Sequence, residues 1–128
     1  MNNQAVVNAY KQVDIGAAVA SASPAELISM LMAGSLKRIL EAKGAIERQD
    51  SSAKGVAISK AIGIVTELQG SLEGADENEI ATNLNRLYDY MLRTLIAANA
   101  ESSVEKLDEV AQLMLEVKTG WDGMEVRA

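Results

Sequence analysis

The 128-residue sequence contains no cysteine and no histidine. Without cysteine there are no disulfide bonds, no thiolate nucleophile and none of the usual zinc sites. Without histidine there is no Ser-His-Asp triad, no phosphorelay histidine and no Glu-x-x-His pair of the kind that binds di-iron centres in helical bundles. These two absences remove most common catalytic machinery, so the composition argues against an enzyme.

Proline and aromatic residues are also scarce. The chain has one proline, three tyrosines, one tryptophan and no phenylalanine, although 48% of its residues are hydrophobic. Alanine, leucine, isoleucine, valine and methionine therefore supply the apolar residues, a composition typical of helices packed on helices. No run of about 18 apolar residues occurs, so the sequence predicts no membrane-spanning helix.

Positive charge is in deficit. The 12 lysines and arginines are outnumbered by 18 acidic residues, which gives a net charge of −6. A surface that neutralises phosphates is not expected, so nucleic acid is excluded as a partner. The N-terminal stretch lacks the basic and continuous apolar segments of a signal peptide. We therefore expect a cytoplasmic protein of one domain, with no cofactor, metal or small-molecule substrate.

The start of the first helix is marked by Ser23, Pro24 and Glu26. Serine and glutamate at this spacing form a capping box, and proline is tolerated at the first helical position. Apolar residues then recur at helical spacing until the polar break at residues 49–52. A long amphipathic helix is therefore predicted between these two points.

Three further amphipathic stretches follow. The second helix is predicted over residues 53–72, and the third over residues 77–99. Two more candidate capping boxes mark helix starts, namely Asp76-x-x-Glu79 and Ser102-x-x-Glu105. Because the connections are short, consecutive helices must run antiparallel.

The predicted fold is therefore all-α, an antiparallel up-down four-helix bundle. We expect the bundle to span residues 23–122, each helix being roughly 30 Å long. Residues 1–22 are predicted to form a partly ordered N-terminal arm or short helix, and residues 123–128 a frayed tail. Leu84, Leu87, Tyr88, Met91 and Leu95 of the third helix are assigned to the core because they share one face.

Several large apolar residues do not fit the buried stripes. Tyr90 and Ile96 lie off opposite edges of the apolar face of the third helix, and Leu36 and Leu40 point well away from the stripe of the first. Isolated surface apolar residues are normal. Several together favour a contiguous surface for a protein partner, for which the natural ligand is another amphipathic helix. The candidate contacts are Leu36, Leu40, Ile64, Leu68, Tyr90 and Ile96.

The N-terminal arm has two open interpretations. It is either a disordered tail or a segment that covers the partner surface when that surface is empty. The apolar residues available for covering it are Val6, Val7, Tyr10, Val13 and Ile15. Two other function classes also stay open at this point: a self-associating structural or regulatory helical protein, such as a homodimer, and an enzyme with a carboxylate metal centre.

The sequence resembles one known family over nearly its whole length, the flagellar secretion chaperones that bind flagellin. The matching segments are SASPAELISMLMAGSLKRIL (21–40), SKAIGIVTELQGSLE (59–73), EIATNLNRLYDYMLRTLIAAN (79–99) and LDEVAQLMLEVKTGW (107–121). Among these, LYDYM after NL, together with the late tryptophan, is the most specific part.

The resemblance implies a cytoplasmic bundle that holds unpolymerised flagellin before export. Such chaperones bind the disordered C-terminal segment of flagellin, which becomes helical against the bundle, and they prevent premature filament assembly. They also help deliver flagellin to the export gate in the membrane. Tyr10 matches a family tyrosine tied to docking at that gate, and the family's N-terminal segment can occupy the cargo surface until cargo displaces it.

Overall fold

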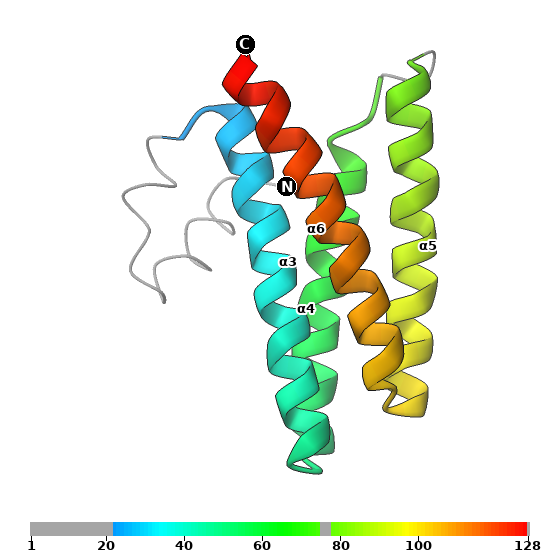
Figure 1. Ribbon diagram of the computed structural model, residues 1–128. Helices are drawn as coiled ribbons and strands as arrows, with labels where there is room; N and C mark the ends of the chain where they lie inside the picture. The colour runs from blue at the N-terminus through cyan, green and yellow to red at the C-terminus, as the bar shows by residue number, and fades with distance from the viewer. Residues whose placement is uncertain (1–21, 75–77, 128) are drawn as a thin grey trace.

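The computed structural model describes residues 22–74 and 78–127, with side chains up to residue 124. The described part of the chain forms four helices: α3 (Pro24–Glu47), α4 (Ser51–Gly70), α5 (Glu79–Glu101) and α6 (Val104–Arg127). The helices run alternately up and down (Figure 1), which confirms the predicted all-α four-helix bundle. The predicted arm lies almost entirely outside the described residues.

Each helix packs against two neighbours. Helix α3 contacts α4 and α6, and α5 contacts the same two helices from the other side. The α5–α6 pair is the least closely packed of the four. Figure 1 shows why: the two helices meet near their short connection and lie further apart toward the start of α5 and the end of α6. The bundle is therefore tight along α3 and α4 and more open between α5 and α6.

The helix starts follow the predicted capping chemistry, with two corrections. The Ser23 side chain accepts a hydrogen bond from the Glu26 backbone, and the Glu26 side chain reaches back to the Ser23 N–H, so the first capping box is confirmed. Helix α5 is capped by Asn78, while Asp76 is outside the described residues. Helix α6 is capped by Ser103, which accepts from the Lys106 N–H at 3.1 Å. The predicted cap at Ser102 was therefore one residue too early.

Two turns contain non-glycine residues in the left-handed backbone conformation. Gln49 has φ 59° after α3, and Ser102 has φ 51° after α5. In each turn the next N–H bonds to a carbonyl five residues earlier: Asp50 to Ala45 at 2.8 Å and Ser103 to Ala98 at 3.0 Å. This is the Schellman arrangement, in which glycine is the usual residue. The short turns are thus specified by hydrogen bonding despite an unfavourable side chain.

The core follows the predicted apolar stripes. Tyr88, Met91 and Leu95 are buried as expected, but Leu84 and Leu87 are only half-buried. The latter two pack against the buried core and lie at its edge. The other large side chains that are almost fully buried are Met32, Ile39, Ile58, Val65, Leu68, Leu107, Val110 and Met114.

The end of α6 is tied to the start of α3. The Trp121 indole N–H donates to the Ala25 carbonyl at 3.1 Å, and the Ser29 hydroxyl donates to Asp122 at 2.7 Å. The backbone stays helical through Gly120 and Gly123. The helix continues to Arg127, and the frayed tail expected from residue 123 stays a prediction.

Candidate partner-binding surfaces

The six predicted contact residues do not form one surface. Leu40, Ile96 and Tyr90 are exposed, with 67%, 60% and 39% of the residue surface accessible. Leu36 and Ile64 are half-buried and pack against the core. Leu68 is completely buried. The prediction for Leu68 has to be corrected, because its side chain lies on the inner stripe of α4 and is a core residue.

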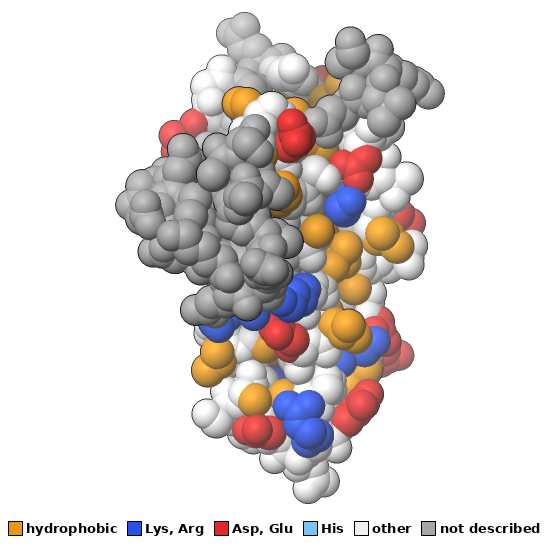
Figure 2. All heavy atoms as spheres, turned by 90° about the vertical axis from the view of Figure 1, so that its left-hand side faces the viewer, with side chains coloured by type: hydrophobic (Ala, Val, Ile, Leu, Met, Phe, Trp, Pro, Cys, Tyr) orange, Lys and Arg blue, Asp and Glu red, His pale blue; other side chains and the backbone are white. Residues whose placement is uncertain are grey.

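One apolar surface lies between α3 and α6. Lys43 of α3 is ion-paired with Asp108 of α6, and Ser29 is hydrogen-bonded to Asp122. In an antiparallel pair these two contacts fix the register, so Leu36, midway between Ser29 and Lys43, lies level with residue 115 of α6. We define Leu36, Leu40 and Leu115 as the α3–α6 face. Leu115 is 49% exposed. Figure 2 looks onto the α3 side of the bundle and shows hydrophobic side chains at the surface beside charged ones.

The polar end of this face is held by Asp122. Its carboxylate accepts from Lys118 at 2.6 Å and from Ser29 at 2.7 Å. Both hydrogen bonds favour the charged form, so they hold the pKa of Asp122 below its usual value. Polar contacts at both ends thus fix how α3 and α6 lie against each other. The apolar side chains of the α3–α6 face lie between these contacts.

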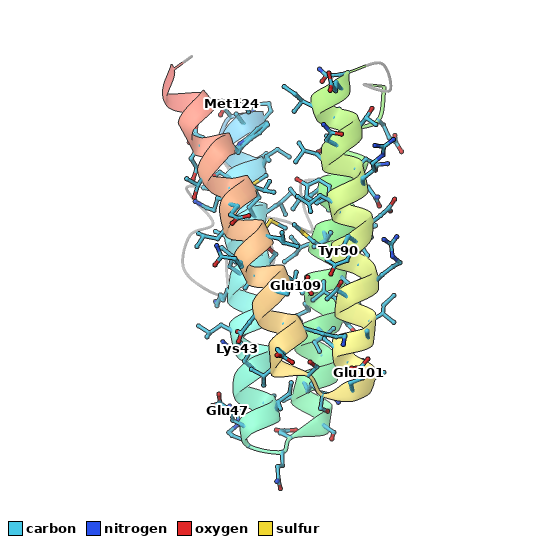
Figure 3. All side chains as sticks on the ribbon, turned by 45° about the vertical axis from the view of Figure 1, so that its right-hand side comes forward. Lys43, Glu47, Tyr90, Glu101, Glu109 and Met124 are labelled. Atoms are coloured by element: carbon cyan, nitrogen blue, oxygen red, sulfur yellow. The ribbon has the colours of Figure 1, made fainter. Side chains whose placement is uncertain are left out.

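A second surface lies between α5 and α6. Tyr90 lies at the end of this surface that is nearer to the α5–α6 connection. The Tyr90 hydroxyl donates to Glu109 of α6 at 2.6 Å, and this bond raises the pKa of Tyr90. Figure 3 labels both residues where α5 and α6 face one another, with Met124 further along α6. The Tyr90–Glu109 contact shows which sides of the two helices face each other.

Apolar residues continue from this contact toward the open end. On α5, Leu87, Leu84 and Ile80 precede Tyr90 at steps of three or four residues, which keeps them on one side of the helix. On α6 the same steps from Glu109 lead to Leu113 and Val117, and a further seven residues lead to Met124. We define the α5–α6 face as Ile80, Leu84, Leu87, Leu113, Val117 and Met124.

The α5–α6 face is only partly covered. Leu84, Leu87, Leu113 and Val117 are half-buried, and Ile80 and Met124 are 63% and 51% exposed. The looser packing of α5 against α6 leaves these side chains accessible. Apolar side chains at helical spacing have the chemistry to contact an amphipathic helix.

Of the nine residues of these two faces, the sequence pattern identified only Leu36 and Leu40 as candidate contacts. Leu84 and Leu87 had been assigned to the core, and Ile80, Leu113, Leu115, Val117 and Met124 had not been named as contacts. A signal for two of them was present. Leu113 and Leu115 lie about 100° to either side of the buried Met114, so they widen the apolar stripe of α6. Leu36 and Leu40 were recognised on α3 because they lie outside its stripe in the same way. Ile80 and Met124 carry no such signal, since their exposure depends on the divergence of the two helices.

Ile96 and Ile64 belong to neither face. Ile96 follows Tyr90 by six residues, which turns it about 240° around α5, away from α6. Ile64 lies on the side of α4 that packs on α3. The prediction that Tyr90 and Ile96 occupy opposite sides of the helix agrees with this placement, and their roles as partner contacts stay predictions.

Neither face offers chemistry beyond burial and hydrogen bonding. Within residues 22–74 and 78–127 no group of three or more acidic side chains is arranged to hold a metal ion. None of the described helices is long and apolar enough to cross a membrane. Binding of another polypeptide is the activity that these two surfaces can support.

Comparison with known proteins gives matches over almost the whole chain. The family model described as flagellar protein FliS matches residues 6–128. The chain is 48% identical over 115 residues to the flagellar secretion chaperone FliSB of Pseudomonas aeruginosa, covering 90% of this chain and 91% of that protein. It is 40% identical over 123 residues to the flagellar secretion chaperone FliS of Salmonella typhimurium, with 95% and 91% covered. The Vibrio cholerae protein of the same name is 34% identical over 116 residues, with 91% and 85% covered.

Proposed function

Because the chain belongs to the FliS family and is thus a flagellar secretion chaperone, we propose that its cargo is unpolymerised flagellin. It binds the C-terminal segment of flagellin in the cytoplasm, prevents premature polymerisation and helps deliver flagellin to the export gate. The family is one of chaperones and not of enzymes.

The observation that carries the proposal is the α5–α6 face. Its six apolar side chains recur at helical spacing on two helices; Ile80 and Met124 are exposed, and the other four are partly buried. An ordinary bundle of this size buries such residues against a neighbouring helix. Their exposure in a secretion chaperone supports a helical segment of cargo as the ligand.

The energetics favour a long contact. A disordered segment that becomes ordered on binding loses about 1–2 kcal/mol of conformational entropy per residue. Burial of apolar surface returns about 25 cal/mol per Å², so each ordered residue must bury several tens of Å². The α3–α6 face alone, with Leu36, Leu40 and Leu115, is too small for this. We therefore propose that cargo contacts both faces, which share α6.

Docking at the export gate is assigned to the N-terminal arm. The resemblance supports Tyr10 in this role, and Val6, Val7, Val13 and Ile15 as the residues that cover the cargo surface when it is empty. These residues are outside the described part of the chain, so the support comes from the sequence alone.

Co-expression with flagellin tests the proposal. We expect a stable soluble complex that co-purifies with full-length flagellin and is lost when the C-terminal segment of flagellin is deleted. Flagellin lacking its N-terminal segment is the matched control and should still bind. No complex with full-length flagellin, or a complex that survives the C-terminal deletion, would contradict the proposal.

A further inference from the structure

The methionines are the side chains of this chain that a mild oxidant can modify reversibly. The sequence has six methionines and no cysteine, so no thiol competes for the oxidant. The thioether of methionine takes up one oxygen atom to become the sulfoxide, and methionine sulfoxide reductases reverse the reaction. The response of each methionine therefore depends on how far an oxidant dissolved in water can reach its side chain.

The methionines differ sharply in exposure. Met32 is 1% exposed, and Met91 and Met114 are completely buried in the core. Met30 is half-buried and packs against that core. Met124 is 51% exposed and is the one exposed methionine within residues 22–74 and 78–124. A dissolved oxidant therefore reaches Met124 more readily than the methionines that hold the core together.

Met124 lies on the α5–α6 face. It follows Val117 by seven residues, which is two helical turns, so both side chains are on the same side of α6. Figure 3 shows Met124 near the end of α6, away from the Tyr90–Glu109 contact. Val117 is half-buried, so Met124 is the most accessible apolar side chain that α6 contributes to this face. Oxidation at this position changes the polarity of the face itself.

We propose that Met124 is a reversible oxidation site, at which a peroxide converts the thioether to the sulfoxide and thereby lowers the affinity of the α5–α6 face for cargo. The inference rests on the proposed function, because the flagellin segment has to cover Met124 when it binds.

The two reactions balance with a peroxide and a dithiol. The Met124 sulfur attacks one oxygen of hydrogen peroxide, so that a sulfur–oxygen bond forms, the oxygen–oxygen bond breaks and the second oxygen leaves as water. The sulfur is oxidised by two electrons and the peroxide is reduced. In the reverse reaction a methionine sulfoxide reductase removes the oxygen as water, and two thiols are oxidised to a disulfide.

The sulfoxide should weaken binding without unfolding the bundle. Its oxygen is a polar acceptor, and burial of such a group beneath an apolar segment is unfavourable unless a donor is present. Leu113 and Val117, which share this side of α6, have no donor in their side chains. The three fully buried methionines are shielded, so the packing of the core is unchanged. Oxidation of Met124 therefore acts on the surface that binds cargo and leaves the fold intact.

Peptide mass spectrometry of the full-length chain, after brief exposure to hydrogen peroxide without flagellin, tests the site. We expect the sulfoxide to form at Met124 about tenfold or more faster than at Met32, Met91 and Met114, because exposure controls the reaction. Methionine sulfoxide reductases with a dithiol should remove it. An unoxidised Met124, or equal rates at Met124 and the buried methionines, overturns the proposal.

Calorimetry with unpolymerised flagellin tests the effect on cargo. The chain is oxidised first and the peroxide removed, so flagellin itself is never oxidised. The oxidised chain should bind about tenfold more weakly than the unoxidised chain, since a polar group then has to be buried, and reductase treatment should restore the affinity.

Met124→Leu and Met30→Leu form a matched pair, and each variant is compared with its own unoxidised form. Met124→Leu should lose the response to peroxide. Met30→Leu retains Met124 and should respond as the original chain does. A response that persists in Met124→Leu, or one that is lost in Met30→Leu, overturns the proposal.

The two measurements separate this inference from the proposed function. If the unoxidised chain does not bind flagellin, the proposed function fails and the effect on cargo fails with it, while the mass spectra still decide whether Met124 is the oxidation site. If flagellin binds equally well before and after oxidation of Met124, the proposed function stands and this inference alone is refuted.

Discussion

Tyr88 and Tyr90, separated by one residue, show how the surroundings of a phenol determine its pKa. Tyr88 is 2% exposed, and burial raises the pKa of its phenol to about 12. Tyr90 lies at the surface, and the hydrogen bond to Glu109 is the main cause of its raised pKa. The helical wheel alone predicted this difference, since Tyr88 falls on the apolar face and Tyr90 at its edge.

Tyr88 makes the stability of the bundle depend on alkaline pH. Its pKa is about 12 in the folded protein and 10.0 when the phenol is exposed in the unfolded chain, so below pH 10 both states are protonated and the contribution is constant. Above pH 10 the unfolded chain loses the proton first, and stability falls as pH rises toward 12, by about 1.4 kcal/mol per pH unit. Urea unfolding of Tyr88→Phe against the unmodified chain should show a shallower alkaline decline in the variant.

Tyr90→Phe serves as the comparison in this experiment, because its hydroxyl is at the surface. An alkaline decline that is identical in Tyr88→Phe and the unmodified chain would mean that Tyr88 does not hold its proton in the folded state.

Because Leu40 is exposed, a substitution at this position can test binding without disturbing the fold. Leu40→Asp should leave the free energy of unfolding within about 0.5 kcal/mol of the original, as expected for a surface substitution. It should weaken binding of the flagellin C-terminal segment, measured by calorimetry, about tenfold or more, since a charge then replaces an apolar contact. Val56→Asp on α4 is the control, because Val56 is 53% exposed and belongs to neither face.

Leu36→Asp is less informative. Leu36 is half-buried against the core, so a charge there should destabilise the bundle as well as affect binding. Undiminished binding by Leu40→Asp would remove the α3–α6 face from the cargo surface.

At the scale of the helices, the caps and the buried stripe of a helix could be predicted from the sequence, whereas the distance between two helices could not. The Ser23 capping box and the buried stripe of α4 follow from residue types at fixed spacing. The half-exposure of Leu84 and Leu87 does not, because it depends on how far α6 lies from α5. For the same reason the sequence showed Leu40 to be a misfit, while the position of Leu115 across the interface from it follows only from the register set by Lys43 and Asp108.

The turn between α3 and α4 stores strain that a single substitution can remove. Gln49 has φ 59°, a conformation that costs about 1–2 kcal/mol for a residue with a side chain. Gln49→Gly should therefore stabilise the protein by about 1 kcal/mol, seen as a higher urea midpoint with an unchanged slope.

Arg48→Gly provides the opposite case one residue earlier. Arg48 has the right-handed helical conformation, φ −85° and ψ −1°, so glycine there only adds flexibility to the unfolded chain and should destabilise. Destabilisation by Gln49→Gly would show that the side chain of Gln49 contributes more than its backbone strain costs.

For the whole molecule, the residues proposed for cargo binding and for docking lie in different parts of the chain. The proposed cargo surfaces lie on α3, α5 and α6, while the residue proposed for the export gate, Tyr10, belongs to the predicted N-terminal arm. Tyr10→Ala should therefore reduce flagellin secretion into the medium while flagellin still co-purifies with the chaperone from cells. Tyr10→Phe is the control for the hydroxyl. Loss of co-purification with Tyr10→Ala would contradict a separate docking role.

The Trp121–Ala25 hydrogen bond gives the molecule a built-in optical probe. Trp121 is the single tryptophan of the chain, and its indole lies half-buried where the end of α6 meets the start of α3. Its fluorescence therefore reports on this junction alone. An emission maximum that moves to longer wavelength signals that water has reached the indole and that the two helix ends have parted. The kinetics of that event can be followed without any attached label.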